Sequence, residues 1–311
     1  MRKVSKKMKK VLVLGGNGFI GRNLCRCLAE KEYEVYSFDM VVPPIVDSRI
    51  NYIAGDFFDD YTLETIVKGM AVIYHAICTL NPGNSNEKYI MGYERDFVQT
   101  VKLCSYIKDT GTKLIFLSSG GTVYGNQDIQ PITESAVPVP INHYGNLKLC
   151  IENTLRTFNF QTQTNMLVAR ISNPYGPGQD YHKGVGFVDA VIKRALNNEK
   201  IEIWGDGNVV RDYIYIDDVC EMLISLLNYQ GSYEVFNISS NRGVSQLEII
   251  EIIKQLEGNL EVEYKPARNV DARKIVLDNT RIMSTINIEL TAFEDGIRKY
   301  YEYVKSIKES E

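Results

Sequence analysis

The segment that most restricts the fold of this chain spans residues 10–21 and reads KVLVLGGNGFIG. Its four consecutive apolar residues, 11–14, predict a strand that is buried on both faces, as in a parallel sheet. Three glycines spaced three residues apart follow at the turn into a helix. Glycine lets the backbone approach a phosphate, and a helix N-terminus offers unpaired N–H groups with a partial positive charge. The segment therefore predicts a pyrophosphate-binding turn, formed by Gly15, Gly18 and Gly21, with Phe19 and Ile20 at the start of the helix.

A second predicted strand, residues 34–38, ends in Asp39, 18 positions after Gly21. At about this offset a carboxylate can bind the ribose hydroxyls of an adenosine, and it would repel a 2′-phosphate, so the pattern predicts NAD rather than NADP. The alternative is a loop aspartate that only caps the next turn, but the preceding glycines favour a cofactor. After a third apolar segment, 51–54, Asp56 is expected either to contact the adenine or to form a turn.

Strands and helices alternate along the chain, with further strands predicted at 71–75, 113–117 and 165–171 and one helix at 93–110. This alternation predicts an α/β fold, a Rossmann-type doubly wound parallel sheet with a smaller C-terminal α/β substrate lobe. The turn formers at 173–178 are expected to lie outside any element and to mark the exit towards that lobe. The expected parts are a flexible basic tail at 1–9, an NAD-binding domain at 10–175 with returns from about 209–240, and an interleaved, mainly substrate-binding lobe at 176–311.

In the C-terminal part, strands are predicted at 201–204 and 234–238 and helices at 187–197 and 217–227. A further helix at 245–256 opens with a capping box, Ser245 with Glu248.

The amino-acid composition argues against two classes of binding partner, nucleic acids and membranes. A net charge of −4 provides no basic field for nucleic acid, and no apolar run approaches the ~20 residues that span a bilayer. Six Lys/Arg occur in the first ten residues, but no signal-peptide core follows them. A cytoplasmic protein without nucleic-acid or membrane partners is expected. His75, His143 and His182 lie far apart, so no metal site is predicted.

Candidate catalytic residues follow the fifth predicted strand. The strand runs into SSGGTVYG, residues 118–125, and the carboxyl ends of parallel strands are where such sheets bind ligands. Tyr144 and Lys148 are four residues apart and share one helix face, so the ammonium can lie near the phenol. Lowering the pKa of a tyrosine from about 10 by three units needs roughly 4 kcal/mol, which a lysine and an oxidised nicotinamide together can supply. An ordinary exposed helix pair is the alternative.

As a set, these motifs resemble the extended short-chain dehydrogenase/reductase family, in its nucleotide-sugar epimerase/dehydratase branch. The resemblance covers Lys10 to about Tyr300 and implies tightly held NAD, with an NDP-sugar, a UDP-hexose being favoured, beneath the C-terminal lobe. It also implies a homodimer that pairs helices such as 93–110 and 147–158. The motifs that carry it are the glycine turn, Asp39, the 118–125 segment, Tyr144-x-x-x-Lys148, Arg170 to Gly178 and Gly205 to Asp218.

The resemblance assigns roles to individual residues. Tyr144 would take the proton of the sugar 4-hydroxyl while C4 gives a hydride to NAD, and the 4-keto sugar would turn and receive the hydride on its other face. Lys148 would hold the ribose and lower the pKa of Tyr144. Asn173 would contact the sugar or the diphosphate. Arg211 and Arg268 would clamp the diphosphate, which suits guanidinium geometry, although surface ion pairing is the alternative for both.

One position departs from the family pattern. Many 4-epimerases have Ser or Thr where this chain has Gly120, so the hydrogen bond to the reacting oxygen is expected from Thr122, which we favour, from Ser119 or from water. Related dehydratases and decarboxylases usually have an acid at the Thr122 position, and its absence argues against both reactions. Trp204 is expected either to border the nucleotide base or to be an ordinary core residue.

Two other functions compete with the 4-epimerase. A reductase of NDP-4-keto-6-deoxysugars would use the same Tyr144 and Lys148 but release its oxidised cofactor in each cycle. A redox sensor or scaffold would bind a dinucleotide without turnover, and the presence of the Tyr–Lys pair argues against it.

Overall fold

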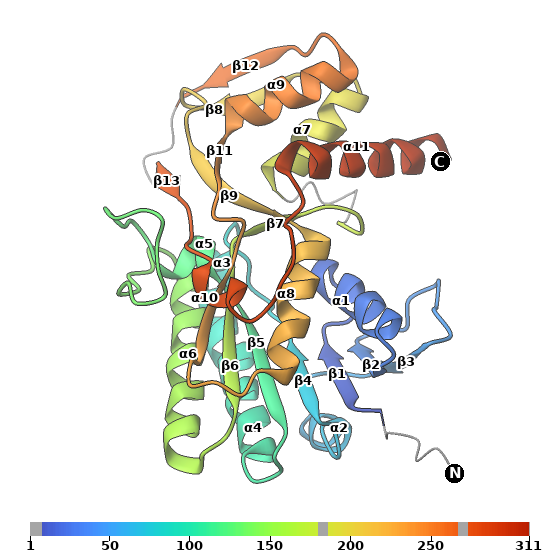
Figure 1. Cartoon of the computed structure of the whole chain (residues 1–311), viewed down its shortest axis with the longest axis vertical. Coiled ribbons are helices and arrows are strands. Elements are labelled where there is room, and N and C mark those ends of the chain that lie inside the picture. The colour runs from blue at the N-terminus through green and yellow to red at the C-terminus, as the bar shows by residue number, and fades with distance from the viewer. Residues whose placement is uncertain (1–7, 180–185, 267–272, 311) are drawn as a thin grey trace.

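A computed structural model describes residues 8–179, 186–266 and 273–310 of the 311-residue chain. A seven-stranded sheet forms the base, and a smaller lobe sits above the carboxyl ends of its strands (Figure 1). The strand order is β10-β6-β5-β4-β1-β2-β3 and every pair is parallel, which confirms the predicted doubly wound sheet. Its strands are β1 (Lys10–Leu14), β2 (Glu34–Asp39), β3 (Ile50–Ala54), β4 (Val72–His75), β5 (Lys113–Ser119), β6 (Met166–Ile171) and β10 (Val235–Ile238).

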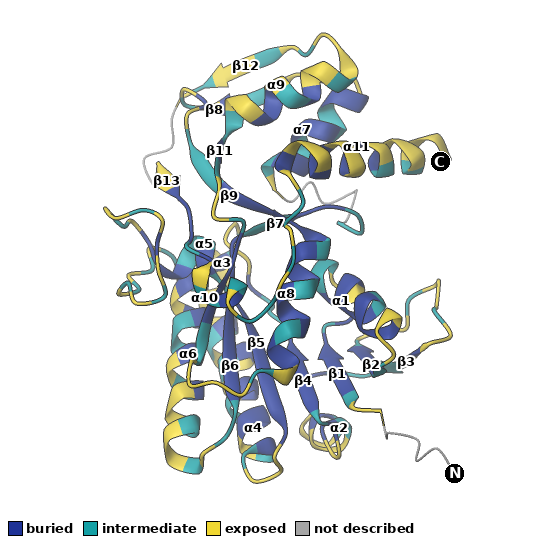
Figure 2. Cartoon of the chain, viewed as in Figure 1, coloured by how far each residue is buried: buried dark blue, intermediate teal, exposed yellow. Residues whose placement is uncertain are grey.

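Helices cover both faces of this sheet. Because side chains alternate along a strand, Val11 and Val13 pack on one face and Leu12 and Leu14 on the other, and all four are fully buried. Figure 2 shows the central strands of the large sheet buried, while the outer faces of the helices, the loops and the strand β12 (Val262–Lys265) of the lobe are exposed. The helices are α1 (Phe19–Glu30) and α8 (Ile216–Asn228) on one face, and α2 (Asp60–Ile66), α4 (Val98–Ile107) and α6 (His143–Thr162) on the other.

Two segments differ from the sequence prediction. The helix predicted at 93–110 is divided, because α3 (Ser85–Met91) is followed by a π-helical turn, η1 (Gly92–Phe97), before α4 begins. A π turn widens the helix by one residue and shifts its buried face, which a regular 3.6-residue pattern does not reveal. Residues 173–178 are also not entirely irregular, since β7 (Asn173–Tyr175) pairs with β9. Pro174 is tolerated there because this three-residue strand pairs on one side only.

The lobe is organised around β9 (Val210–Tyr215), which pairs with β7, β11 (Gly243–Ser245) and β13 (Lys274–Ile275). The capping box of Ser245 and Glu248 is confirmed. The C-terminal helix α11 was not among the sequence expectations, and its Ile297, Tyr300 and Val304 complete the core of the lobe. The other elements are α5 (Gly120–Val123), α7 (Phe187–Leu196), β8 (Ile201–Trp204), α9 (Gln246–Glu257), β12 (Val262–Lys265), α10 (Thr280–Met283) and α11 (Phe293–Ser310).

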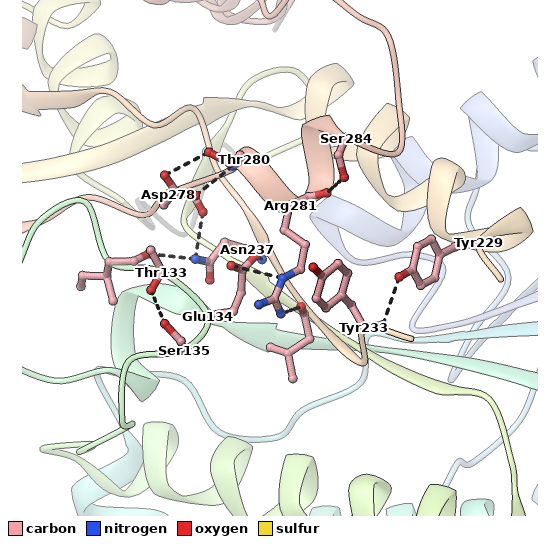
Figure 3. Close-up of polar contacts among 12 residues, drawn as sticks. Thr133, Glu134, Ser135, Tyr229, Tyr233, Asn237, Asp278, Thr280, Arg281 and Ser284 are labelled. Carbon is pink, nitrogen blue, oxygen red and sulfur yellow. Dashed lines mark hydrogen bonds and ion pairs between the residues drawn. The ribbon is translucent and has the colours of Figure 1, made fainter. Parts of the chain in front are cut away.

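After β13 the chain returns to the edge of the large sheet, where Figure 3 shows a cluster of polar contacts around β10. Arg281 Nη1 donates to the carbonyl of Val235 at 2.6 Å, and its Nε lies 3.6 Å from Glu134. The backbone N–H of Asn237 donates to Glu134, and its side-chain amide donates to the carbonyl of Asp278. These contacts satisfy backbone groups that an edge strand would otherwise leave unpaired.

Candidate active site

The glycine turn after β1 forms a tight cradle. Gly15 has a φ of +87°, in the left-handed region that favours glycine. A Cβ on Gly21 would lie 2.1 Å from the carbonyl oxygen of Gly15, so α1 can start this close to β1 only without a side chain there. Phe19 and Ile20 form the first turn of α1, where N–H groups lack partners within the helix. The cradle therefore fits the pyrophosphate of a dinucleotide.

Asp39 lies beside this turn, at the end of β2. Its Oδ2 accepts the N–H of Asn17 at 2.9 Å and its Oδ1 accepts that of Met40 at 2.8 Å. Asp39 and Asp56 both line a cavity of about 230 Å³. Asp56 also accepts the N–H of Phe58 at 2.9 Å and so forms the expected turn, while its contact with the adenine stays a prediction.

A second cavity, of about 280 Å³, continues from the first, and the two share Gly15, Gly18, Ala76 and Cys78. We call these two cavities together the cofactor groove. Its size and its glycine-rich wall suit an extended dinucleotide. The structure brings together in this groove all the residues that the sequence assigned to the cofactor, which are Gly15, Gly18, Phe19, Ile20, Gly21, Asp39, Asp56 and Lys148.

Tyr144 and Lys148 lie one turn apart on α6 and both line the groove. Lys148 Nζ is 5.6 Å from the centroid of the Tyr144 ring and donates to the carbonyl of Leu117 at 2.9 Å. The same ammonium lies 4.6 Å from the centroid of the Phe116 ring. A carbonyl oxygen and an aromatic face both attract a cation, so these contacts hold the buried Lys148 charge beside the phenol.

Burial raises the pKa of Tyr144, while the charge of Lys148 and a hydrogen bond with Ser119 act against that rise. Burial lowers the pKa of Lys148, but Cys78, Tyr144, Asp96 and Glu152 together outweigh burial, and the net pKa is raised. The charge of Lys148 therefore lowers the pKa of Tyr144, as predicted. In the protein alone, burial raises this pKa by more than Lys148 lowers it. A further positive charge beside the phenol is needed to bring its pKa towards neutrality.

The hydroxyl groups near Tyr144 occupy different environments. Ser119 lines the groove beside Tyr144, and its hydroxyl acts to lower the pKa of that phenol. The Oγ1 of Thr122 is buried and has no hydrogen-bond partner within the part of the chain that the structure describes. A Cβ on Gly120 would lie 2.3 Å from Leu277 Cδ1, so a side chain at this position would meet the core. The geometry therefore favours Ser119, the second of the two hydroxyls expected from the sequence.

A third cavity, of about 270 Å³, lies in the lobe, and we call it the substrate cavity. Asn173 and Arg211 line it, as does Trp204, which is 40% exposed and so is not an ordinary core residue. Pro174 lines both this cavity and the cofactor groove, which places the two side by side. Arg268, the second expected diphosphate ligand, lies outside the described residues. The other residues that line the cavity are Tyr175, Gln179, Gly186, Phe187, Val188, Asp189, Val209, Tyr213 and Gln246.

Sequence reasoning missed part of the groove. The start of the loop after β4 lines the groove with Ala76, Ile77 and Cys78, which no motif in the sequence singled out. Asp96, buried in η1, accepts hydrogen bonds from the backbone and hydroxyl of Thr79 at 2.8 and 2.9 Å. It fixes the loop that carries Cys78. The sequence feature that could have identified Asp96 is an acidic residue within an otherwise amphipathic helix pattern.

The architecture and the groove are those of a dinucleotide-binding α/β protein. A sequence profile of the NAD dependent epimerase/dehydratase family matches residues 11–239. The chain belongs to this family, whose members are NAD-dependent enzymes of nucleotide-sugar chemistry.

Individual relatives agree with this assignment. A putative UDP-glucose 4-epimerase of Methanocaldococcus jannaschii is 28% identical, over 95% of this chain and 98% of the relative. A dTDP-4-dehydro-6-deoxyglucose reductase of Escherichia coli is 30% identical, over 96% and 97%. The crystal structure of UDP-glucose 4-epimerase from Thermotoga maritima with UDP-glucose superposes with a TM-score of 0.89 at 29% identity, covering 96% of this chain and 99% of that one.

Within residues 8–179, 186–266 and 273–310, no helix is both long and apolar enough to cross a bilayer. The same residues contain no group of three or more His, Cys, Asp or Glu side chains arranged to hold a metal ion.

Proposed function

We propose that the chain is an NAD-dependent epimerase that inverts C4 of a nucleotide sugar, with a UDP-hexose as the favoured substrate. The observation that carries this proposal is the position of Tyr144, Lys148 and Ser119 in a groove that meets the substrate cavity at Pro174. A sugar whose nucleotide lies in that cavity can extend to the phenol. The similarity to UDP-glucose 4-epimerases supports this choice of substrate.

The chain's own residues then have distinct tasks. NAD, when bound, supplies reversible hydride acceptance at C4. Tyr144 takes the proton of the 4-hydroxyl and later returns a proton to the same oxygen. The Lys148 ammonium stabilises the phenolate, and Ser119 donates a hydrogen bond near the reacting oxygen. Arg211 pairs with the diphosphate, and Asn173 contacts the sugar or the diphosphate.

The second candidate is a reductase of NDP-4-keto-6-deoxysugars. The 30% identity to the Escherichia coli dTDP-4-dehydro-6-deoxyglucose reductase favours it. Both reactions use a phenol and a lysine at the same place, so geometry around Tyr144 does not separate them. They differ in cofactor turnover, because an epimerase regenerates its oxidised cofactor and a reductase consumes a reduced one.

Purified protein distinguishes the two. The chain is denatured to measure released NAD, and the native protein is incubated with UDP-, dTDP- and GDP-sugars without added reductant while NMR follows the configuration at C4. An epimerase retains NAD and interconverts a pair of sugars with no net redox change. Stoichiometric consumption of added NAD(P)H with a 4-keto sugar would replace this proposal by the reductase.

We also propose a homodimer formed by α4 and α6. Val98 on α4 is 44% exposed and Phe160 on α6 is 90% exposed, and a dimer through these helices would cover apolar side chains of this kind. Light scattering of the wild type is expected to give twice the monomer mass, and Phe160→Glu is expected to shift it towards the monomer. A monomeric wild type would contradict the assembly.

A further inference from the structure

Asp212, in the middle of β9, is a fully buried carboxylate that accepts five hydrogen bonds. A buried carboxylate costs several kcal/mol unless its oxygens are satisfied. Burial raises the pKa of Asp212 to about 6, and the hydrogen bonds act against that rise. All five donors are neutral: Ser172 Oγ at 3.1 Å, Ser240 N and Oγ at 2.9 Å each, Asn241 N at 3.1 Å and Leu277 N at 3.2 Å.

These donors belong to three segments that are far apart in the sequence. Ser172 follows β6 and lines the cofactor groove. Ser240 lies between β10 and β11, and Leu277 follows β13. The side chain of Leu277 packs where a Cβ of Gly120 would be, directly after Ser119. Asp212 is therefore connected to the groove through Ser172, which lines it, and through Leu277, which packs against Gly120 beside Ser119.

The residues next to Asp212 along β9 line the substrate cavity. Successive side chains of a strand point to opposite faces, so the neighbours of Asp212, Arg211 and Tyr213, share the other face of β9, and both line the cavity. The backbone carbonyl of Asp212 accepts the side-chain amide of Asn173 at 2.8 Å. Asn173 lines the cavity as well.

We infer that Asp212 is a positioning residue that sets the separation between the two sites. Its carboxylate ties β9, and with it Arg211, to Ser172 in the groove and to Leu277 beside Gly120, and so fixes where a bound nucleotide sugar meets Tyr144. This inference rests on the proposed function. An asparagine cannot replace the carboxylate, because its NH₂ group would face N–H donors and leave at least one of them buried and unpaired. Misplacement of a reacting group by about 1 Å costs about 100-fold in rate.

The test compares Asp212→Asn with a matched control, Asp218→Asn. Asp218 is also buried and accepts the N–H and hydroxyl of Thr291 at 3.0 and 3.1 Å, but Thr291 lines neither cavity. Both variants are expected to melt at lower temperature than the wild type. At temperatures below both unfolding transitions, only Asp212→Asn is expected to lower kcat, by roughly 10- to 100-fold. In that variant, the amount of retained NAD is expected to stay constant, and the Kd for UDP to change by less than about threefold.

Three outcomes would contradict the inference. These are a kcat of Asp212→Asn close to that of the wild type, an equal loss of kcat in Asp218→Asn, and a loss of NAD and UDP binding in parallel with kcat. If Asp212→Asn does not fold, Ser240→Ala removes one donor only, and a kcat lowered by roughly two- to fivefold is expected. An unchanged kcat in that variant would also overturn the inference. Failure of the wild type to retain NAD or to bind UDP would instead refute the proposed function itself.

Discussion

The cofactor groove and the substrate cavity meet at Pro174, but the chain builds them in different ways. The groove is made largely of short contiguous stretches, such as the glycine turn at 15–21 and the end of β5, each shaped by its own local sequence. The cavity combines short stretches of β7 and α7 with isolated residues of β8 and β9, and only the pairing of the lobe brings these four elements together. The residues expected to bind the cofactor thus lie mainly in segments with a recognisable local sequence, whereas those that line the cavity come together only in the folded lobe.

The strongest test of this contrast is Tyr144→Phe, which removes only the phenolic oxygen at the meeting of the two sites. Turnover is expected to fall by roughly 1,000-fold because the proton of the 4-hydroxyl loses its acceptor, while retained NAD and UDP affinity stay unchanged. Steady-state kinetics and calorimetry measure both. Tyr74→Phe is the control, since Tyr74 is a buried tyrosine that lines neither site and donates to the carbonyl of Leu223 at 2.9 Å. Equal losses in the two variants would remove Tyr144 from the reaction.

Arg211→Ala tests whether the substrate cavity acts independently of the groove. Loss of charge-assisted hydrogen bonds of about 1.5–3 kcal/mol is expected to weaken UDP binding by roughly 10- to 100-fold. Retained NAD should not change. Arg242→Ala is the matched control, because Arg242 pairs with Glu294 on the surface of the lobe. Calorimetric titration with UDP measures both variants, and an unchanged Kd in Arg211→Ala would exclude this guanidinium from the diphosphate site.

Asp39→Asn is the corresponding test of the groove. The amide keeps one acceptor for the turn but no longer repels a 2′-phosphate, so the preference for NAD over NADP is expected to narrow by roughly tenfold. UDP affinity should be unaffected. Refilling the cofactor-free variant with each dinucleotide measures the preference. A ratio identical to that of the wild type would mean that Asp39 does not face the ribose.

The smallest expected effect is at Lys113, at the end of the sheet farthest from both sites. Its buried ammonium donates to the carbonyls of Leu226, Leu227 and Tyr229, where α8 ends. Lys113→Met is expected to lower the free energy of unfolding by about 1 kcal/mol, as measured by urea titration at neutral pH, without changing NAD content or UDP affinity. A loss of either ligand would show that the two sites are coupled to the whole sheet.

The same residue predicts a pH dependence. Burial lowers the pKa of Lys113 to about 8, below its ordinary value of 10.5. The unfolded chain therefore binds more protons than the folded one between pH 8 and 10.5, and stability rises with pH across this interval. The wild type should gain stability relative to Lys113→Met over that range. A constant difference between the two proteins would contradict the lowered pKa.

The features that can be predicted from the sequence are those that depend on neighbouring residues, in line with the contrast between the cofactor groove and the substrate cavity. The buried strand at 11–14 and the spacing of Tyr144 and Lys148 depend on a few neighbouring residues, so the period of a strand or a helix is enough to place them. The order of preference between Ser119 and Thr122 cannot be read from the sequence, because the direction of side chains at and after the end of β5 depends on contacts from elsewhere.

Other features depended on distant partners. The close packing against Gly120 comes from Leu277, a residue near the other end of the chain. The hydrogen bonds of Asp96 to Thr79 and the five donors of Asp212 likewise join segments whose proximity no local pattern encodes. Arg268 stays a prediction.

The path of the chain between the two layers has a practical consequence. After β6 the chain enters the lobe with β7, returns to the sheet with α8 and β10, enters the lobe again with β11 and α9, and reaches the sheet edge once more at α10 (Figure 1). No single cut releases the upper part as a unit, and no single crossover point would allow it to be exchanged for that of a relative. A change of sugar preference in this enzyme therefore has to be made by individual substitutions along the cavity wall, rather than by grafting a module.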